Sequence, residues 1–205
     1  FNNGLNRYPD PIQRNVKSIL SDIKSFPADQ ILLGNGSDEV LDLIFRAFCE
    51  PNQDNVIAIS PSYGMYGVLA NLNAVEYRKS LLNEDHFQPN IKDIFSKVDK
   101  NTKMIFLCSP NNPTGEIINR EAILEIVNRF NCLVIIDEAY IDFATEPSWI
   151  EEIKNYSNVI VTQTLSKAVG LAGIRLGILY ASQEIVAVLN KIKPPYNINQ
   201  LTQLK

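Results

Sequence analysis

Short apolar segments alternate along the chain with stretches whose apolar residues follow a helical spacing. Residues 104–108 are continuously apolar (Met-Ile-Phe-Leu-Cys), which is typical of a strand buried on both faces of a parallel sheet. Between residues 37 and 49, apolar side chains recur at intervals of three and four and predict a helix with one buried face. The same reasoning predicts strands at 31–33, 56–60, 75–80, 104–108, 133–136, 159–162 and 176–180, and helices at 37–49, 61–72, 120–129 and 184–192. Asn119 is the expected N-cap of the helix at 120–129.

This alternation predicts an α/β fold with a mostly parallel central sheet and helices on both faces. Ligands of such sheets bind beyond the carboxyl ends of the strands. Polar residues follow four of the expected strands, in the segments 34–39, 109–115, 137–140 and 163–167. If these strands are parallel, the four segments meet at one edge of the sheet, which is where we expect a functional site.

Composition narrows the class of protein. The chain has 205 residues, of which 45% are hydrophobic and 20% are charged, so we expect one well-packed domain and not a disordered chain. The net charge of −4 without a basic run argues against nucleic acid as a partner. No apolar run approaches the roughly 18 residues of a membrane span, and no signal-peptide pattern opens the chain. We therefore expect neither a membrane nor a nucleic-acid partner.

Cysteine and histidine usage limit the chemistry further. Three cysteines lie far apart without a C-x-x-C pair, which favours reduced thiols in a cytoplasmic protein. His86 is the single histidine and lies in a polar segment that is typical of a surface loop. A metal site built from several histidines is thereby excluded, and we expect no bound metal. A catalytic role for His86 is disfavoured as well.

Lys167 is the first candidate for chemistry. It follows an expected buried strand, has two hydroxyl residues just before it, and precedes the glycine-rich segment 170–177. Arg175, within that segment, can bind an anion through two parallel hydrogen bonds. A lysine beside an anion cradle favours a Schiff-base lysine that holds a phosphorylated aldehyde cofactor. The alternative is an ordinary surface lysine in a loop.

Asp137 and Tyr140 are the second candidates. Asp137 ends an expected strand, where it could be a capping or salt-bridged carboxylate. It could also pair with a cationic ring nitrogen, because a buried carboxylate is costly unless it is paired. Tyr140 could reach the same ligand with its hydroxyl or could be a core aromatic.

Two further segments allow a structural and a functional interpretation. Asn112 lies in Asn-Pro-Thr-Gly, which is a turn by its local chemistry, and only its place at a strand end makes it a ligand candidate. Residues 36–38 begin an expected helix, whose free N–H groups and positive dipole end suit a phosphate. Ser37 could also be simply the N-cap of that helix, and both interpretations can hold together.

Four of these motifs together resemble a known family. Asn112-Pro113-Thr114-Gly115, Asp137-Glu138-Ala139-Tyr140, Ser166-Lys167 and the segment 172–177 follow the order and approximate spacing of the fold-type I pyridoxal-phosphate aminotransferases. The segments 5–11, 34–39, 61–66 and 195–199 are most similar to the subgroup that acts on histidinol phosphate. The resemblance covers essentially the whole chain. It implies that residues 1–205 are the cofactor-binding large domain, without the N-terminal arm and the C-terminal small domain of that family.

The resemblance also implies roles for individual residues. Lys167 would bond to the cofactor aldehyde and then act as general base and acid, and Asp137 would keep the ring nitrogen protonated. Asn112 and Tyr140 would hydrogen-bond the ring oxygen, while Tyr63 would stack on the ring. The phosphate would be held by Ser37, Asp38, Thr164, Ser166 and Arg175. Tyr8 would reach the phosphate in the neighbouring subunit, which implies a homodimer.

The activity that the resemblance implies is transamination between histidinol phosphate and 2-oxoglutarate or glutamate in histidine biosynthesis. The partners would be a small-molecule amino donor and a 2-oxo acid. A threonine-phosphate decarboxylase or an aromatic amino-acid aminotransferase remains open, because the same cofactor apparatus serves both. A non-catalytic, aminotransferase-like half of a transcriptional regulator is a further alternative. A nucleotide-binding domain is disfavoured, since the chain has neither G-x-G-x-x-G after its first strand nor G-x-x-x-x-G-K-[ST].

Overall fold

The structure is a computed structural model that describes residues 5–204. A seven-stranded sheet runs through it. Its strands are β1 (Ile31–Asn35), β2 (Asn55–Ser60), β3 (Glu76–Leu81), β4 (Thr102–Cys108), β5 (Leu133–Asp137), β6 (Val159–Thr164) and β7 (Leu176–Tyr180). They are ordered β1-β7-β6-β5-β4-β2-β3 across the sheet. β7 pairs antiparallel with both β1 and β6, and the other pairs are parallel. The prediction of a mostly parallel sheet is therefore confirmed.

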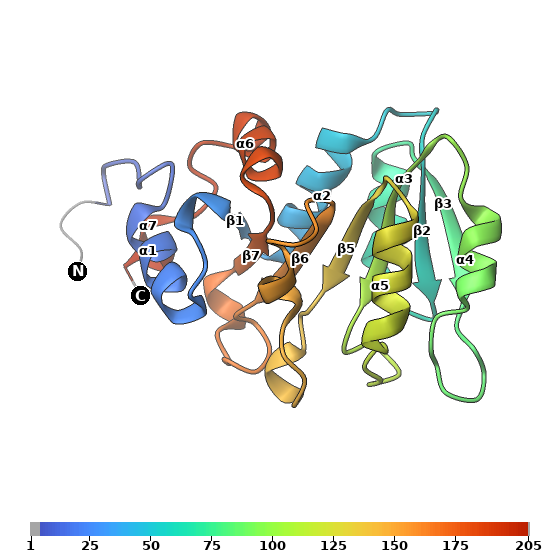
Figure 1. Cartoon of the computed structure of the whole chain (residues 1–205). Coiled ribbons are helices and arrows are strands. Elements are labelled where there is room, and N and C mark those ends of the chain that lie inside the picture. Colours follow the sequence, from blue (N-terminus) through green and yellow to red (C-terminus); the bar gives the residue numbers. More distant parts are fainter. Residues whose placement is uncertain (1–4, 205) are drawn as a thin grey trace.

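Helices cover both faces of this sheet, as Figure 1 shows. They are α1 (Arg14–Lys24), α2 (Ser37–Phe48), α3 (Met65–Leu72), α4 (Ile91–Lys97), α5 (Arg120–Arg129), α6 (Gln183–Ile192) and α7 (Gln200–Gln203). Short 3-10 helices are η1 (Ala28–Gln30), η2 (Ile141–Phe143), η3 (Trp149–Glu152) and η4 (Ala172–Ile174). Side chains of α1, α4, α5 and η3 pack in one core, whereas those of α2, α3 and α6 pack in the other. The sheet thus lies between two helical layers.

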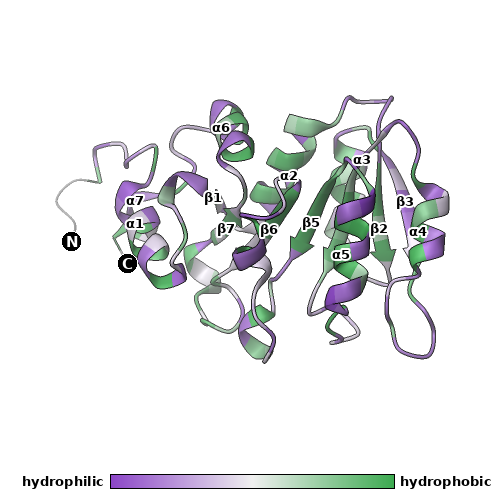
Figure 2. Ribbon diagram, in the orientation of Figure 1, coloured by the Kyte–Doolittle hydropathy of each residue, from purple (hydrophilic) through white to green (hydrophobic). Residues whose placement is uncertain are grey.

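Strand β4 shows how the sequence produces these two cores. Ile105 and Leu107 point into the core under α5, and Met104 and Phe106 point into the core under α2 and α3. All four side chains are fully buried, and burial of each contributes on the order of 2 kcal/mol before entropy is counted. The apolar run at 104–108 therefore has the burial that a strand inside a parallel sheet requires. Figure 2 colours the interior strands β2 and β5 green, while the edge strand β3 is paler.

The structure corrects several predicted boundaries. All seven strands are present within two residues of the expected bounds. The helix expected at 61–72 begins only at Met65, because the preceding Pro-Ser-Tyr-Gly segment forms a turn. Helices α1, α4 and α7 had no counterpart in the sequence prediction. Asn119 occupies the N-cap position of α5, but its side chain makes no capping hydrogen bond to any residue in the range 5–204.

The start of α2 is a second correction. The N-cap is Gly36 and not Ser37, which is already the first helical residue. Gly36 has a φ of 84°, a conformation that glycine adopts far more readily than serine. The turn from β1 into α2 therefore depends on a glycine, and the Ser37 side chain is left for another role.

Candidate active site

A pocket of about 150 Å³ lies at the carboxyl-terminal edge of the parallel strands. Its lining residues come from the last residues of β4, β5 and β6, from the segments after β1, β2, β4, β5 and β6, and from the residue just before β7. They are Ser37, Asp38, Tyr63, Cys108, Asn112, Asp137, Ala139, Tyr140, Thr164, Ser166, Lys167 and Arg175. Arg175 reaches the pocket because β7 runs antiparallel, so the residue before it lies at the edge where the parallel strands end. The sequence predicted that the four segments after β1, β4, β5 and β6 converge, and the structure brings them together, with Tyr63 after β2 and Arg175 before β7 beside them.

Asp137 is the buried acid of this pocket, with only 3% of its surface exposed. Its Oδ1 accepts hydrogen bonds from the Thr162 hydroxyl and the Ala139 N–H, both at 3.2 Å, and its Oδ2 accepts one from the Tyr66 hydroxyl at 2.6 Å. Burial raises the pKa of Asp137, while the hydrogen bonds from Tyr66, Ala139 and Thr162 act in the opposite direction. No lysine or arginine among residues 5–204 forms an ion pair with it. A buried carboxylate without a cation suits a cationic ligand group.

The first turn of α2 forms one wall of the pocket. Ser37 and Asp38 are its first two helical residues, so their N–H groups have no acceptor within the helix. Helix N-termini carry a partial positive charge and favour anions. This end of the pocket is therefore suited to a phosphate or carboxylate.

Arg175 lies against that helix start. It follows η4 with a φ of 56°, and its carbonyl oxygen accepts a 3.0 Å hydrogen bond from the Gly36 N–H. A Cβ atom added to Gly36 would overlap the Arg175 guanidinium. The guanidinium thus lies in the space left by the missing Cβ of Gly36, beside the first turn of α2, where both can hold the same anion.

Two hydroxyl groups complete the same end of the pocket. Thr164, the last residue of β6, and Ser166 hydrogen-bond through their hydroxyls at 3.0 Å, and the Ser166 N–H donates to Thr164 Oγ1 at 3.2 Å. Thr164 is buried and Ser166 is half-buried. The pair turns the chain from β6 towards Lys167 and offers short polar side chains to an anion.

Lys167 and Tyr140 lie side by side in the pocket. The Lys167 Nζ is 5.4 Å from the centroid of the Tyr140 ring. Lys167 is exposed and pairs with no acid in the described part of the chain. An accessible amine beside an aromatic hydroxyl residue is suited to attack on a carbonyl group.

Tyr63 and Asn112 line the remaining walls. The Tyr63 hydroxyl donates a 3.0 Å hydrogen bond to Asp38 Oδ1. Burial, reinforced by the nearby Asp38 carboxylate, raises the pKa of Tyr63 to about 12, so the phenol stays neutral at physiological pH. Asn112 is half-buried in the loop after β4. A neutral aromatic ring and an amide are suitable neighbours for a planar heterocycle.

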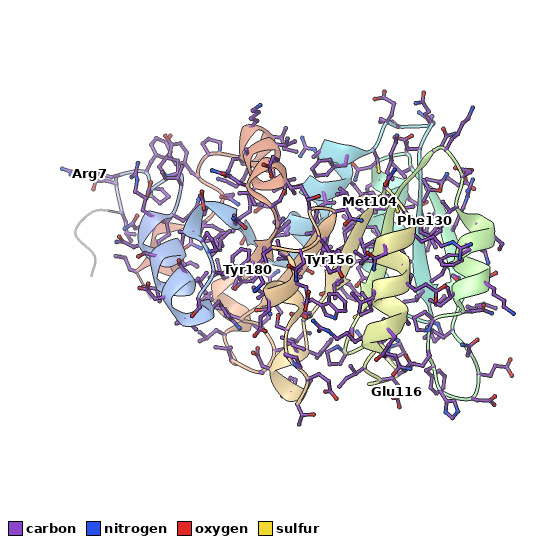
Figure 3. The ribbon with its side chains drawn as sticks, in the orientation of Figure 1. Arg7, Met104, Glu116, Phe130, Tyr156 and Tyr180 are labelled. Carbon is purple, nitrogen blue, oxygen red and sulfur yellow. The ribbon has the colours of Figure 1, made fainter. Side chains whose placement is uncertain are left out.

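Tyr8 is the one expected site residue that does not line this pocket. Its side chain is 80% exposed, and its ring stacks on Tyr196 with 4.3 Å between the centroids. Figure 3 shows Arg7, its neighbour in the chain, pointing outwards from the N-terminal segment.

His86 is exposed in a turn outside the pocket, as the sequence predicted.

The sequence did not single out Tyr66, Thr162, Cys108 or Ala139 as site residues. Tyr66 is fully buried on α3, and its ring stacks on Phe106 with 4.9 Å between the centroids. A helical aromatic is usually a core residue, and nothing in the local sequence shows that its hydroxyl reaches Asp137. The only available signal was its place three residues after Tyr63.

The described part of the chain holds no cluster of three or more His, Cys, Asp or Glu side chains suited to a metal. Cys49, Cys108 and Cys132 are unpaired. None of the helices within residues 5–204 combines the length and apolar character needed to span a membrane.

The chain was compared with protein families and with curated proteins. The family Aminotransferase class I and II matches residues 2–204. A histidinol-phosphate aminotransferase of Flavobacterium johnsoniae is 63% identical over 203 residues, which are 99% of this chain and 58% of that protein. The chain therefore spans somewhat more than half the length of this curated relative.

Solved structures show the same similarity. The histidinol-phosphate aminotransferase of Clostridium acetobutylicum has a TM-score of 0.86 and 31% identity, with 98% of this chain and 60% of that one covered. The L-threonine-O-3-phosphate decarboxylase of Porphyromonas gingivalis has a TM-score of 0.82 and 25% identity, with 97% and 61% covered. Enzymes with different reactions thus share this architecture.

Proposed function

The chain belongs to aminotransferase class I and II, a family of pyridoxal-phosphate enzymes, and from this premise we propose that it binds pyridoxal 5′-phosphate and takes part in transamination. One observation carries the proposal: three kinds of group line the same pocket. They are an accessible lysine, a buried carboxylate without a cation, and a set of anion-binding groups that we call the anion cup (Ser37, Asp38, Thr164, Ser166 and Arg175). Each of the three has a matching group on the cofactor, namely the aldehyde, the ring nitrogen and the phosphate.

The residues present fit the cofactor on structural grounds. The cup would hold the phosphate through the N–H groups of Ser37 and Asp38, the hydroxyls of Thr164 and Ser166, and the Arg175 guanidinium. The φ of 84° at Gly36 and the 3.0 Å bond from its N–H to the Arg175 carbonyl oxygen support this assignment, because they hold the backbone at Arg175 against the first turn of α2. Asp137 would accept the ring N–H, which would give the buried carboxylate its cationic partner.

Pyridoxal phosphate, when bound, supplies an aldehyde that condenses with amines and a ring that accepts the electrons of a carbanion. Lys167 would hold the cofactor through its Nζ and, once released by an amino substrate, would carry a proton between carbon atoms as base and acid. Asp137 would hold the proton on the ring nitrogen. Tyr140 and Asn112 would donate hydrogen bonds to the ring oxygen, and Tyr63 would cover the ring face.

For the substrate, we propose histidinol phosphate as amino donor and 2-oxoglutarate as acceptor, in histidine biosynthesis. The support is the 63% identity to a protein with that name, over 99% of this chain. The second candidate is decarboxylation of threonine phosphate. Its support is the fold that the chain shares with the L-threonine-O-3-phosphate decarboxylase, to which it is 25% identical. Both substrates carry an amine and a phosphate, so their discrimination needs a direct assay.

We also propose a homodimer in which Tyr8 reaches the phosphate of the neighbouring subunit. The exposed position of Tyr8 outside its own pocket supports this arrangement. Three unpaired cysteines support a reducing compartment such as the cytoplasm.

The experiment uses the full-length gene product reconstituted with pyridoxal phosphate. Addition of histidinol phosphate should convert the absorbance of the lysine-bound cofactor to that of the amine form, and 2-oxoglutarate should restore it. Release of carbon dioxide from threonine phosphate, without a response to histidinol phosphate, would assign the second candidate. Absence of any lysine-bound absorbance would overturn the cofactor proposal itself.

A further inference from the structure

Tyr66 is the residue that completes the environment of Asp137. Its hydroxyl donates to Asp137 Oδ2 at 2.6 Å, within the range of hydrogen bonds to an ionised oxygen. Oδ1 accepts instead from Thr162 and from the Ala139 N–H, both at 3.2 Å. Within residues 5–204, Tyr66 is thus the only hydrogen-bond partner of Oδ2 and makes the shortest bond to this carboxylate.

Packing against other aromatic rings fixes the position of the Tyr66 side chain. It is fully buried, its ring stacks on Phe106 at 4.9 Å, and Phe106 in turn stacks on Phe45 at 5.3 Å. The Tyr63 ring packs edge-on against it at 5.6 Å. A row of aromatic rings therefore links the core beneath α2 to the pocket wall, and it leaves the Tyr66 hydroxyl little freedom to turn away from Asp137.

We propose that Tyr66 is a positioning residue, which fixes the orientation and the ionised state of the Asp137 carboxylate so that it can receive the ring nitrogen of the cofactor. This role rests on the proposed function of the pocket. The hydroxyl supplies the hydrogen bond that a carboxylate buried without a cation most needs. Without it, Asp137 would take up a proton more readily and compete with the ring nitrogen for that proton.

Other charged or titratable groups also surround Asp137. Cys108 on β4 and Asp38 on α2 lie close enough to interact electrostatically with it. Tyr63, Tyr140, Lys167 and Arg175 line the same pocket. The Asp38 carboxylate favours protonation of Asp137. The test must therefore isolate the Tyr66 contribution at the Asp137 carboxylate itself.

The first measurement needs no variant and no cofactor. In the full-length cofactor-free protein, carbon-13 spectra would follow the Asp137 carboxyl carbon and the Tyr66 ζ-carbon against pH. Both resonances should titrate with one midpoint, because the tyrosine hydroxyl senses the charge of the oxygen that it contacts. Independent behaviour of the two resonances would overturn the proposal.

The second measurement compares variants. Tyr66→Phe should raise the proton affinity of Asp137 about tenfold, as expected for loss of a hydrogen bond to a charged group. Tyr180→Phe is the matched control, since Tyr180 is fully buried on β7 (Figure 3) and its hydroxyl has no partner among the described residues. It should leave the Asp137 titration unchanged. An equal shift in both variants would indicate a general effect of removing a buried hydroxyl and would overturn the role.

The third measurement separates positioning from a purely structural effect. Tyr66→Phe should weaken the binding of pyridoxal phosphate several-fold but leave the binding of an analogue with C–H in place of the ring nitrogen unchanged. Equal weakening of both ligands, or of neither, would overturn the proposal. If the wild type binds no pyridoxal phosphate, the proposed function fails together with the role of Tyr66. If binding is intact and the carbon-13 results fail, only the role of Tyr66 is lost.

Discussion

The backbone N–H of Gly36 donates a 3.0 Å hydrogen bond to the carbonyl oxygen of Arg175. This bond joins the turn between β1 and α2 to the residue directly before β7, in a segment far away in the sequence. Gly34 and Gly177 are paired in the same β1–β7 ladder. The bond places the Arg175 guanidinium beside the N-terminus of α2, so the anion cup depends on how two distant strands pair.

Gly177→Ala tests that dependence. A Cβ atom at residue 177 would overlap backbone atoms of Gly36 and Ser37, which cannot move independently of β1 and α2. Overpacking of this kind destabilises a fold by about 1–3 kcal/mol, and phosphate binding should weaken in parallel. Urea unfolding gives the stability change. Gly64→Ala is the control, because its Cβ would meet nothing within 4 Å, and an equal loss in both variants would contradict the explanation.

Arg175→Ala tests the anion cup. We expect pyridoxal phosphate to bind about 10- to 100-fold more weakly, the range for loss of a hydrogen-bonded charge partner, and pyridoxal without its phosphate to bind almost as before. Equilibrium titration of both ligands makes the comparison. Arg46→Ala, which changes an exposed arginine in the last turn of α2, is the control and should alter neither affinity. Equal weakening of both ligands would argue against phosphate recognition by Arg175.

Lys167→Ala tests the proposed covalent attachment. The absorbance of the lysine-bound cofactor should be absent, and transamination should fall by at least about 10³-fold, because both the attachment and the proton carrier are lost. Lys191→Ala, an exposed lysine on α6, should behave as wild type. Near-normal turnover of Lys167→Ala would refute the assignment of the site.

Asp137→Asn makes a prediction about pH. Burial raises the folded-state pKa of Asp137 above its unfolded value, so its stabilising contribution is present in acid and is lost as pH rises through the folded-state pKa. Relative to wild type, the stability of the cofactor-free Asn variant should therefore rise from acid to neutral pH, by about 1.4 kcal/mol for each unit by which burial raises the pKa of Asp137. Denaturant titrations between pH 4 and pH 8 would show it, and a pH-independent difference would count against it.

Lys17→Met extends the pH argument to a buried base on α1. Lys17 is 8% exposed, and burial, together with the nearby Lys193, lowers its pKa to about 8. Since the unfolded chain holds this proton more tightly, wild-type stability should rise from pH 8 to about 10.5. At pH 7 the Lys17→Met variant should be more stable than wild type by on the order of 2–3 kcal/mol in free energy of unfolding. This difference should disappear above pH 10. Thermal unfolding measures it, with Lys92→Met as the exposed control; a gain that persists at high pH would be inconsistent with this cause.

The sequence predicted most of the sheet because its signals are local. A continuous apolar run such as 104–108 is typical of a strand buried on both faces of a parallel sheet, and polar groups at four strand ends indicated the edge where the pocket lies. The missed helices differ in their local signals. α4 is only seven residues long with one fully buried side chain, Ile94. α1 has apolar residues at 16, 19, 20 and 23, a spacing that predicts a helix, so the sequence carried a signal for α1 that the prediction did not use.

The sequence by itself thus determined the α/β class, the edge of the sheet where the pocket lies, and the lysine, carboxylate and arginine that line this pocket and that we propose for its chemistry. Only the tertiary structure decided that Tyr66 donates to Asp137 and that Gly36, not Ser37, begins α2 beside Arg175. Both facts depend on the packing of segments far apart in the chain. Local residue patterns specify which side chains are buried, but the direction in which a buried hydroxyl or a guanidinium points depends on the elements packed around it.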